Sequence, residues 1–271
     1  MRRWSVPPLL FSRYLAVVIV GLNLAVAAAV LYFFAESRRS EEHKSEAQEA
    51  ALVRLIAKEV ENQYGRIDLT LQIVAEEYAQ QISHGRDEVE NWLQRVAGWH
   101  PALALLRIAD ADGNVIYSPA EDRRSRVPIA DRAYFIQLRD DPQAGLAISQ
   151  PLTGRITRTP IIVLARRIAL PDGRFNGIAL ASLRVEHLHN TLIGMVAKDP
   201  AEVGLIDSEF RWVAGRAWQS DAAEGETGLL VAALRTAVEA APQEGFFATT
   251  RTGTEMLVAY ARSAAFGFYV I

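Results

Sequence analysis

The sequence predicts an α+β protein in which one long helix precedes two modules built on antiparallel sheets. Three observations predict this class. Residues 14–35 carry no charged side chain, residues 36–82 keep a helical spacing of apolar residues, and two later groups of short apolar segments are separated by turns. Half of the 271 residues are apolar, so the chain can bury a core of its own.

Composition excludes several classes of site. The chain has no cysteine, which rules out disulfides, a thiol nucleophile and a zinc-thiolate site. Its net charge of −3 argues against nucleic acid as the main partner. His187 and His189 are two residues apart and cannot share a helical face, and the sequence holds neither a GxSxG elbow nor a Walker loop. We therefore predict no catalytic residue, no metal site and no cofactor.

The N-terminal residues predict a membrane anchor. Residues 1–13 are basic, and Tyr14–Ala35 is long enough for one helix across a hydrocarbon core of about 30 Å. A cleaved signal peptide is the alternative, because Ala25–Ala29 offers small residues, but the apolar run continues to Phe34. Three basic residues lie on each side of the span, and the acidic residues after it favour a cytoplasmic N-terminus. We expect a single inner-membrane span with the rest of the chain in the periplasm.

Residues 36–82 predict one long amphipathic helix that continues out of the span. Its apolar residues recur every three or four positions: Leu52, Ile56, Val60, Tyr64, Ile67, Leu71, Val74, Tyr78 and Ile82. We expect the distal half of this helix to pack on the sheets of its own chain. The proximal half, rich in Glu, Ala and Gln, is expected to pair with the same helix of a second copy, which predicts a homodimer.

The segment 83–128 predicts the first elements after the long helix. A short helix is expected over 87–97, and strands over 103–109 and 115–118 flank a turn at Asp110–Asn114. Asp110, Asp112, Asn114 and Glu121 match positions 1, 3, 5 and 12 of an EF-hand loop, but Val115 stands where that loop requires glycine, so a hairpin turn is the preferred interpretation. Residues 119–128 are expected to form a loop.

The segment from Asp131 to Leu183 predicts a helix over 131–141 and strands over 145–152, 159–170 and 175–183. The residues that match a known pattern are Asp131, Arg132, Tyr134, Phe135, Gly145–Pro151, Leu164–Arg166, Asp172–Phe175 and Gly177. In this order they resemble the distal half of the double Cache domain, a PAS-like extracytoplasmic ligand sensor of bacterial receptors. A smaller copy of the layout follows a connecting helix over 186–198, with strands over 203–206, 212–214, 245–250 and 256–262 and a helix over 227–241.

The resemblance implies a membrane-distal module over 83–185 and a membrane-proximal module over 186–271. It implies a small-molecule pocket between the Tyr134 helix and the distal sheet, and a signal passed through the membrane to an output domain such as a diguanylate cyclase or a histidine kinase. Residues 266–271 form an apolar strand without a polar tail, which we interpret as an open sheet edge leading into further chain. The alternative function is a membrane-anchored assembly protein that uses the long helix to oligomerise.

Arginine concentrates in the same region. Residues 123–174 contain ten Arg, no Lys and four Asp, a balance of +6. The simplest interpretation is a solvated basic face, but several of these arginines lie inside apolar strands, and their planar forks suit carboxylates. We therefore predict a small anionic ligand, with a carboxylate favoured. The candidate ligand-binding residues are Arg132, Tyr134, Arg139, Arg166, Ser149 and Tyr117.

Alternation along the strand makes Arg166 share a face with Ile162 and Leu164, while Arg167 points the other way. The family match favours Arg166 as the residue that faces the Tyr134 helix. The alternative is that Arg166 forms a structural ion pair with Asp131 or Asp172.

Overall fold

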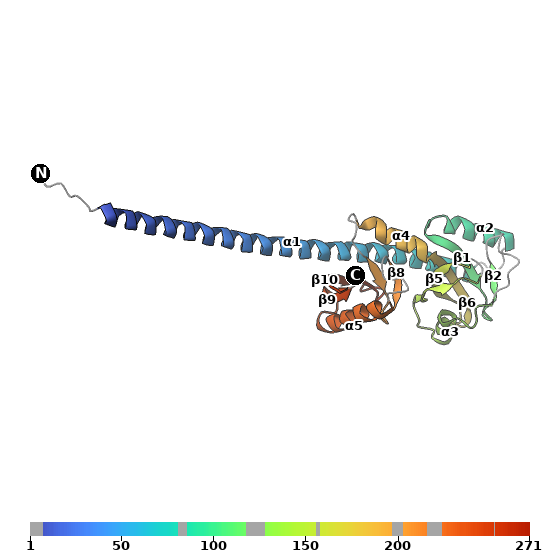
Figure 1. The fold of residues 1–271 in the computed structure, drawn as a ribbon. Coiled ribbons are helices and arrows are strands. Elements are labelled where there is room, and N and C mark those ends of the chain that lie inside the picture. The colour runs from blue at the N-terminus through green and yellow to red at the C-terminus, as the bar shows by residue number, and fades with distance from the viewer. Residues whose placement is uncertain are drawn as a thin grey trace. The chain divides into compact units, whose positions relative to one another are not determined.

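The computed structural model describes residues 8–80, 86–117, 128–155, 158–196, 203–215, 224–251 and 253–271 (Figure 1). The chain divides into two compact units, Met1–Ala51 and Leu52–Ile271. The first unit contains the N-terminal part of helix α1 (Pro8–Gln80). In the described part of the chain, no helix is long and apolar enough to cross a membrane. The predicted span at Tyr14–Ala35 has a helical backbone, but most of its side chains lie outside the described residues.

The remainder of α1 is the framework of the second unit. Six of its side chains, spaced three or four residues apart, are at most 3% exposed: Ile56, Val60, Tyr64, Ile67, Leu71 and Val74. This spacing places them on one face of the helix, and they form a single apolar cluster with residues of both sheets. The long helix predicted from the sequence is therefore confirmed as far as Gln80.

The first sheet follows α2 (Arg86–Ala97) and is antiparallel throughout. Its strands are β1 (Leu103–Ala109), β2 (Val115–Tyr117), β3 (Ala147–Ile148), β4 (Leu152–Thr153), β5 (Pro160–Ala169) and β6 (Phe175–Arg184). The order is β2-β1-β6-β5-β3, and β4 also pairs with β5. The predicted hairpin turn at Asp110–Asn114 is confirmed, because the Asp110 carboxylate accepts hydrogen bonds from the backbone N–H groups of Asp112 and Asn114.

One predicted strand in this sheet is interrupted. The sequence favoured a continuous strand over 145–152, but the structure has the two short strands β3 and β4, separated at Ser149–Pro151. The Ser149 hydroxyl takes part in the hydrogen bonding at the break. Its Oγ accepts a hydrogen bond from the Val163 N–H at 2.8 Å, in place of a backbone carbonyl of the strand ladder.

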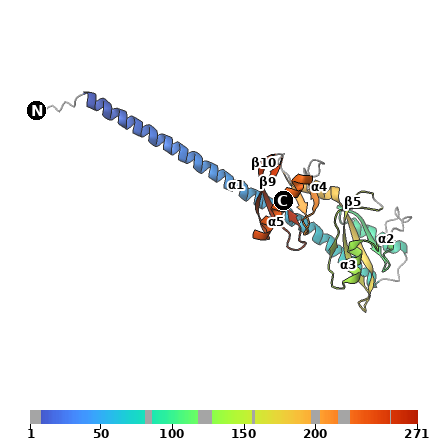
Figure 2. The ribbon, with the colours of Figure 1, turned by 60° about the horizontal axis from the view of Figure 1, so that its bottom comes forward.

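The two faces of the first sheet carry different helices. Ile162, Leu164 and Ile168 of β5 belong to the cluster that contains α1 and α2. Their neighbours Ile161, Val163 and Ala165 face α3 (Ala133–Asp140) instead, as the alternation of a strand requires. Figures 1 and 2 show α2 and α3 on opposite sides of this sheet.

The second sheet follows α4 (Val185–Met195) and is also antiparallel. It comprises β7 (Gly204–Ile206), β8 (Trp212–Gly215), β9 (Glu244–Arg251), β10 (Thr254–Arg262) and β11 (Tyr269–Val270), in the order β8-β7-β11-β10-β9. Helix α5 (Glu224–Ala240) covers one face, where Tyr260 donates hydrogen bonds to the carbonyls of Ala237 and Ala241.

The interpretation of residues 266–271 as an open edge was wrong. Strand β11 is hydrogen-bonded to β7 on one side and to β10 on the other, so it lies inside the sheet. Its Val270 side chain is fully buried in the cluster around α1. The apolar character of this segment therefore reflects burial in the second sheet, a tertiary contact that local sequence does not reveal.

An ion pair fixes the first sheet to α1. Arg166 of β5 donates from Nε to Asp68 Oδ1 at 2.6 Å and from Nη2 to Asp68 Oδ2 at 2.8 Å. Only 27% of the arginine side chain and 16% of the aspartate side chain are exposed. Two parallel bonds make this pair geometrically specific, and either partner would be poorly solvated without the other.

Replacing Arg166 with alanine is expected to lower the free energy of unfolding by about 1.5–3 kcal/mol, because it leaves Asp68 partly buried without its partner. Asp68→Ala should have a similar effect, and the double variant should lose much less than the sum of the two. Urea unfolding of the chain in detergent measures these changes.

Arg174→Ala is the matched control for this measurement. Arg174 also pairs with an aspartate, Asp172, but the two side chains are 76% and 51% exposed. Removing that pair should leave the urea midpoint almost unchanged. A loss in Arg166→Ala no larger than that of this control would contradict the structural role of the Asp68 pair.

Candidate ligand-binding site

A small cavity lies between the start of α3 and the face of the first sheet that α3 covers. Its volume is about 40 Å³, enough for a carboxylate group or for a few water molecules. The cavity exists because alternate residues of β1, β5 and β6 point to this face, while Leu152–Arg155 closes one side. Its described lining residues are Arg107, Val115, Ile129, Arg132, Tyr134, Leu152, Gly154, Arg155, Ile161, Val163, Leu180 and Ser182.

Three arginines reach this cavity from three different elements. Arg107 comes from β1, Arg132 immediately precedes α3, and Arg155 follows β4. None of the lining residues described above is acidic. Arg107 is 7% exposed, so its guanidinium is largely shielded from bulk solvent where it lines this cavity.

Arg155 is anchored by an acid just outside the cavity. Its Nη1 lies 3.0 Å from Asp131 Oδ1 and its Nη2 lies 2.5 Å from Asp131 Oδ2, and Nη1 also donates to the Pro128 carbonyl. The hydrogen bond from Arg155 holds the pKa of the Asp131 carboxyl below its usual value. The aspartate therefore stays ionised at neutral pH and fixes the direction of the Arg155 fork.

Tyr134 supplies a neutral hydrogen-bonding group at the same place. Its side chain is 6% exposed, and burial raises the pKa of its hydroxyl, although the nearby Arg132 and Arg155 act in the opposite direction. The hydroxyl remains protonated at neutral pH. It can donate one hydrogen bond to an anion in the cavity.

Arg166 and Arg167 lie on opposite faces of β5 as strand alternation predicted, but Arg166 does not face α3 as expected. Arg166 does share a face with Ile162 and Leu164, but this face meets α1. Arg167 is the residue that reaches α3: its Nη1 donates to the carbonyls of Leu138 and Arg139, and its guanidinium lies 4.8 Å from the centre of the Phe175 ring. Arg166 is absent from the described lining of the cavity, and its ion pair is with Asp68.

Two further predicted residues lie elsewhere on the first sheet and its helix. Arg139 is exposed near the end of α3, where its Nε lies 2.7 Å from Asp140 Oδ1. Tyr117 of β2 packs edge to face on Tyr78 of α1, with ring centres 5.6 Å apart. Of the six predicted residues, the small cavity brings together Arg132 and Tyr134.

A larger cavity of about 520 Å³ lies between the two sheet modules. Tyr64, Phe266 and Phe268 form an aromatic part of its wall, and each phenylalanine packs edge to face on Tyr64. The predicted residue Ser149 lines this cavity. Its hydroxyl donates to the Gln150 carbonyl and accepts from the Val163 N–H. Both bonds are made within the protein, at the break between β3 and β4.

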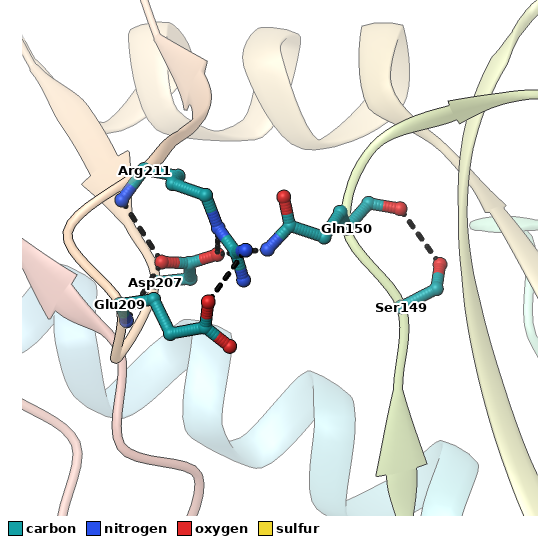
Figure 3. A network of polar contacts seen from close by, with 5 residues as sticks. All are labelled: Ser149, Gln150, Asp207, Glu209 and Arg211. Atoms are coloured by element: carbon teal, nitrogen blue, oxygen red, sulfur yellow. Dashed lines mark hydrogen bonds and ion pairs between the residues drawn. The ribbon is translucent and has the colours of Figure 1, made fainter. Parts of the chain in front are cut away.

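Polar contacts cross this larger cavity from one module to the other (Figure 3). Gln150 Nε2 donates to Asp207 Oδ2 at 2.7 Å. Arg211 Nε donates to the same oxygen at 2.9 Å, and Asp207 Oδ1 accepts the N–H groups of Glu209 and Arg211. The Asp207 carboxylate is thus occupied by protein donors, and its contact with Gln150 connects the β3–β4 bend to the turn of the second sheet.

Sequence reasoning missed Arg107 and Arg155. Arg107 lies outside the arginine-rich stretch 123–174, in the strand Leu103–Ala109. It is the only charged residue of that strand, and its position between Leu106 and Ile108 puts it on the opposite face from both. A single charge inside an apolar strand was the signal that could have identified it.

Comparison with known proteins identifies the fold. No protein-family model matches the chain, and no curated protein matches it. Solved structures do match it over most of its length. The extracellular domain of the putative histidine kinase rpHK1S-Z16 has a TM-score of 0.74 at 20% identity, over 84% of this chain and 93% of that domain.

Two chemoreceptor domains are also similar. The ligand-binding domain of Campylobacter jejuni Tlp3, in complex with L-valine, has a TM-score of 0.64 at 16% identity, over 86% of this chain and 93% of that one. The ligand-binding domain of Pseudomonas fluorescens CtaA, in complex with L-serine, has a TM-score of 0.61 at 15% identity, over 84% and 96%. At these identities the likeness concerns the fold. The chain has the fold of the extracellular sensor domains of bacterial histidine kinases and chemoreceptors, as its resemblance to Cache-type sensors predicted.

Proposed function

We propose that this chain is the extracytoplasmic sensor region of a double Cache membrane receptor and that it binds a small carboxylate-containing molecule beside α3. The observation that carries the proposal is the cavity that three arginines line, with no acid among its described lining residues. The planar forks of Arg107 and Arg132 suit a carboxylate, and the Tyr134 hydroxyl adds a neutral donor.

The size of the two cavities suggests how such a ligand is held. About 40 Å³ accommodates a carboxylate but not a whole metabolite. Arg132, Tyr134 and Leu152 line both the small cavity and the larger one, so the rest of the ligand can extend toward the space between the modules. The similar Tlp3 and CtaA domains are described with L-valine and L-serine, which both carry a carboxylate. We propose an amino acid or another small organic acid as the ligand.

The proposal includes a membrane tether. We place the span at Tyr14–Ala35 in the inner membrane, with the N-terminus cytoplasmic and the sensor periplasmic. The described side chains of this segment support the tether, because the large apolar ones are 49–73% exposed: Leu22, Val26, Val30, Tyr32 and Phe33. The proposal also includes a distal module over 83–185 and a proximal module over 186–271. It further includes pairing of two copies through the long helix, and an output domain such as a diguanylate cyclase or histidine kinase.

Ligand binding is the first test. A thermal-shift screen of the chain in detergent against amino acids and small organic acids should find a stabilising compound. Calorimetry should then give an affinity about tenfold to over a hundredfold weaker for Arg132→Gln, because a lost hydrogen bond to a charged group costs about 1.5–3 kcal/mol. Tyr134→Phe should also weaken binding by about tenfold or more, since it removes a hydrogen bond to an ionised carboxylate.

Two arginine variants serve as controls for that experiment. Arg139→Gln changes an exposed arginine near the other end of the same helix, and it should leave the affinity unchanged. Arg166→Ala should reduce stability without weakening binding, since its guanidinium contacts Asp68. A folded Arg132→Gln protein that binds with unchanged affinity would refute the assignment of the cavity.

The tether and its orientation can be tested with one introduced cysteine, because the chain has none of its own. Arg174 lies in an exposed turn, so Arg174→Cys should react with a membrane-impermeant maleimide added to cells with a permeabilised outer membrane. The labelled protein should be found in the membrane fraction, because the span holds it there. Labelling only after lysis of the inner membrane would contradict the periplasmic placement.

A further inference from the structure

The larger cavity offers space and an aromatic wall that the small cavity lacks. Its volume is about 520 Å³, against about 40 Å³ for the small one. Tyr64 of α1 belongs to this wall, and the rings of Phe266 and Phe268 pack on it edge to face with centres 5.7 Å away. Ile162 and Leu205 add apolar surface from the two sheets. An aromatic ring placed in this space buries apolar surface and gains ring contacts.

The two cavities meet at the arginine that is proposed to bind the carboxylate. Arg132 lines both of them, and its guanidinium forms no hydrogen bond or ion pair with a residue that the structure describes. Tyr134 and Leu152 also line both cavities. The small cavity accommodates a carboxylate and little more. A carboxylate held by Arg132 therefore leaves the rest of its molecule in the larger cavity.

The acids that line the larger cavity already have arginine partners. Both oxygens of Asp207 accept hydrogen bonds from protein donors, Arg211 among them (Figure 3). Arg211 also pairs with Glu209, whose side chain is 67% exposed. Both oxygens of Asp131 contact Arg155. An ammonium group on the ligand would thus enter without an acid of its own among the described lining residues, and burying an unpaired charge is costly.

The Tyr64 hydroxyl forms no hydrogen bond with the described part of the chain. This tyrosine lines the larger cavity and is 3% exposed, and burial raises the pKa of its hydroxyl, which therefore stays protonated at neutral pH. A buried hydroxyl without a partner costs free energy. A hydrogen-bonding group on the ligand would offset that cost.

We infer that the ligand is an arylalkanoate, a carboxylate that carries an aromatic ring on a short carbon chain and has no ammonium group. Its carboxylate binds Arg132, and its ring lies in the larger cavity against Tyr64, Phe266 and Phe268. A hydroxyl on the ring is favoured, because it can bond to the Tyr64 hydroxyl. The inference rests on the proposed carboxylate site and narrows its ligand from amino acids and small organic acids to one chemical class.

Matched acids test the ring. Calorimetry on the full chain in detergent should show that phenylpropionate binds at least tenfold more tightly than propionate, which has the same chain without the ring. The reason is that only phenylpropionate can fill the aromatic part of the larger cavity. Equal affinities for the two acids would overturn the inference.

L-Phenylalanine tests the ammonium group, because it is phenylpropionate with an ammonium added to the chain. It should bind at least tenfold more weakly than phenylpropionate, since the acids of the cavity are paired with arginines. Equal or tighter binding of L-phenylalanine or of a smaller amino acid would show the inference to be wrong. The carboxylate site would still stand in that case if Arg132→Gln weakened the amino acid. Failure of every carboxylate to bind would remove the proposed function as well.

Phe266→Leu tests where the ring lies, because it keeps an apolar side chain but removes one ring of the wall. It should weaken phenylpropionate about two- to tenfold, the range expected for one aromatic pair, and leave propionate unchanged. Phe246→Leu is the matched control, since Phe246 is also half-buried in the second module but is not among the described lining residues. An effect on phenylpropionate no larger than that of this control would contradict the placement of the ring.

Tyr64→Phe tests the hydroxyl contact and keeps the ring packing. The para-hydroxyl derivative of phenylpropionate should bind the unaltered chain about two- to tenfold more tightly than phenylpropionate, the effect of one neutral hydrogen bond. Tyr64→Phe should abolish this difference and leave the affinity for phenylpropionate itself nearly unchanged. Absence of the difference in the unaltered chain, or its persistence in Tyr64→Phe, would refute the contact between the ring hydroxyl and Tyr64.

Discussion

The buried face of α1 is the constraint on which both sheets depend. Tyr64 packs against Phe266 and Phe268 of the second module, while Ile162 and Leu164 of the first belong to the same apolar cluster. Each large apolar side chain fully buried in such a cluster stabilises the fold by about 1.5–3 kcal/mol. Neither sheet covers this face on its own. The two modules therefore share one core through the helix, and a displacement of α1 would disturb the packing of both.

Several arginines of the basic stretch contact groups of the protein itself, and one of them depends on α1. Arg166 fixes β5 to α1 through Asp68, and its neighbour Arg167 holds the last carbonyls of α3. Arg139, Arg155 and Arg174 each contact a nearby aspartate. Strand alternation and local ion pairs thus place the arginines of this basic stretch in different parts of the structure. What distinguishes the candidate site is the convergence of arginines from three elements on one cavity, and Arg107 belongs to it although it lies outside the basic stretch.

The periodicity of the sequence was sufficient to predict the elements but not which faces would meet. A spacing of three or four residues predicted the long helix, and alternation correctly grouped Arg166 with Ile162 and Leu164. Alternation cannot say which helix covers that face, and Asp68 lies 98 residues away from Arg166. The strand break at Ser149 and the central position of β11 escaped prediction for the same reason, since both follow from hydrogen bonds to distant strands.

A ligand beside α3 would act on a site that is already joined to the second module. Leu152 lines the small cavity, and Gln150, two residues earlier, donates to Asp207 of the second module. The bend that carries both residues is held to β5 by Ser149, so it behaves as part of the first sheet. A ligand changes a conformational equilibrium only through a difference in affinity between two states. In the proposed receptor, Arg132, Tyr134 and Leu152 line both cavities and are placed to contribute to that difference. The shared core along α1 and the Gln150–Asp207 bond are the contacts through which a change there would reach the second sheet.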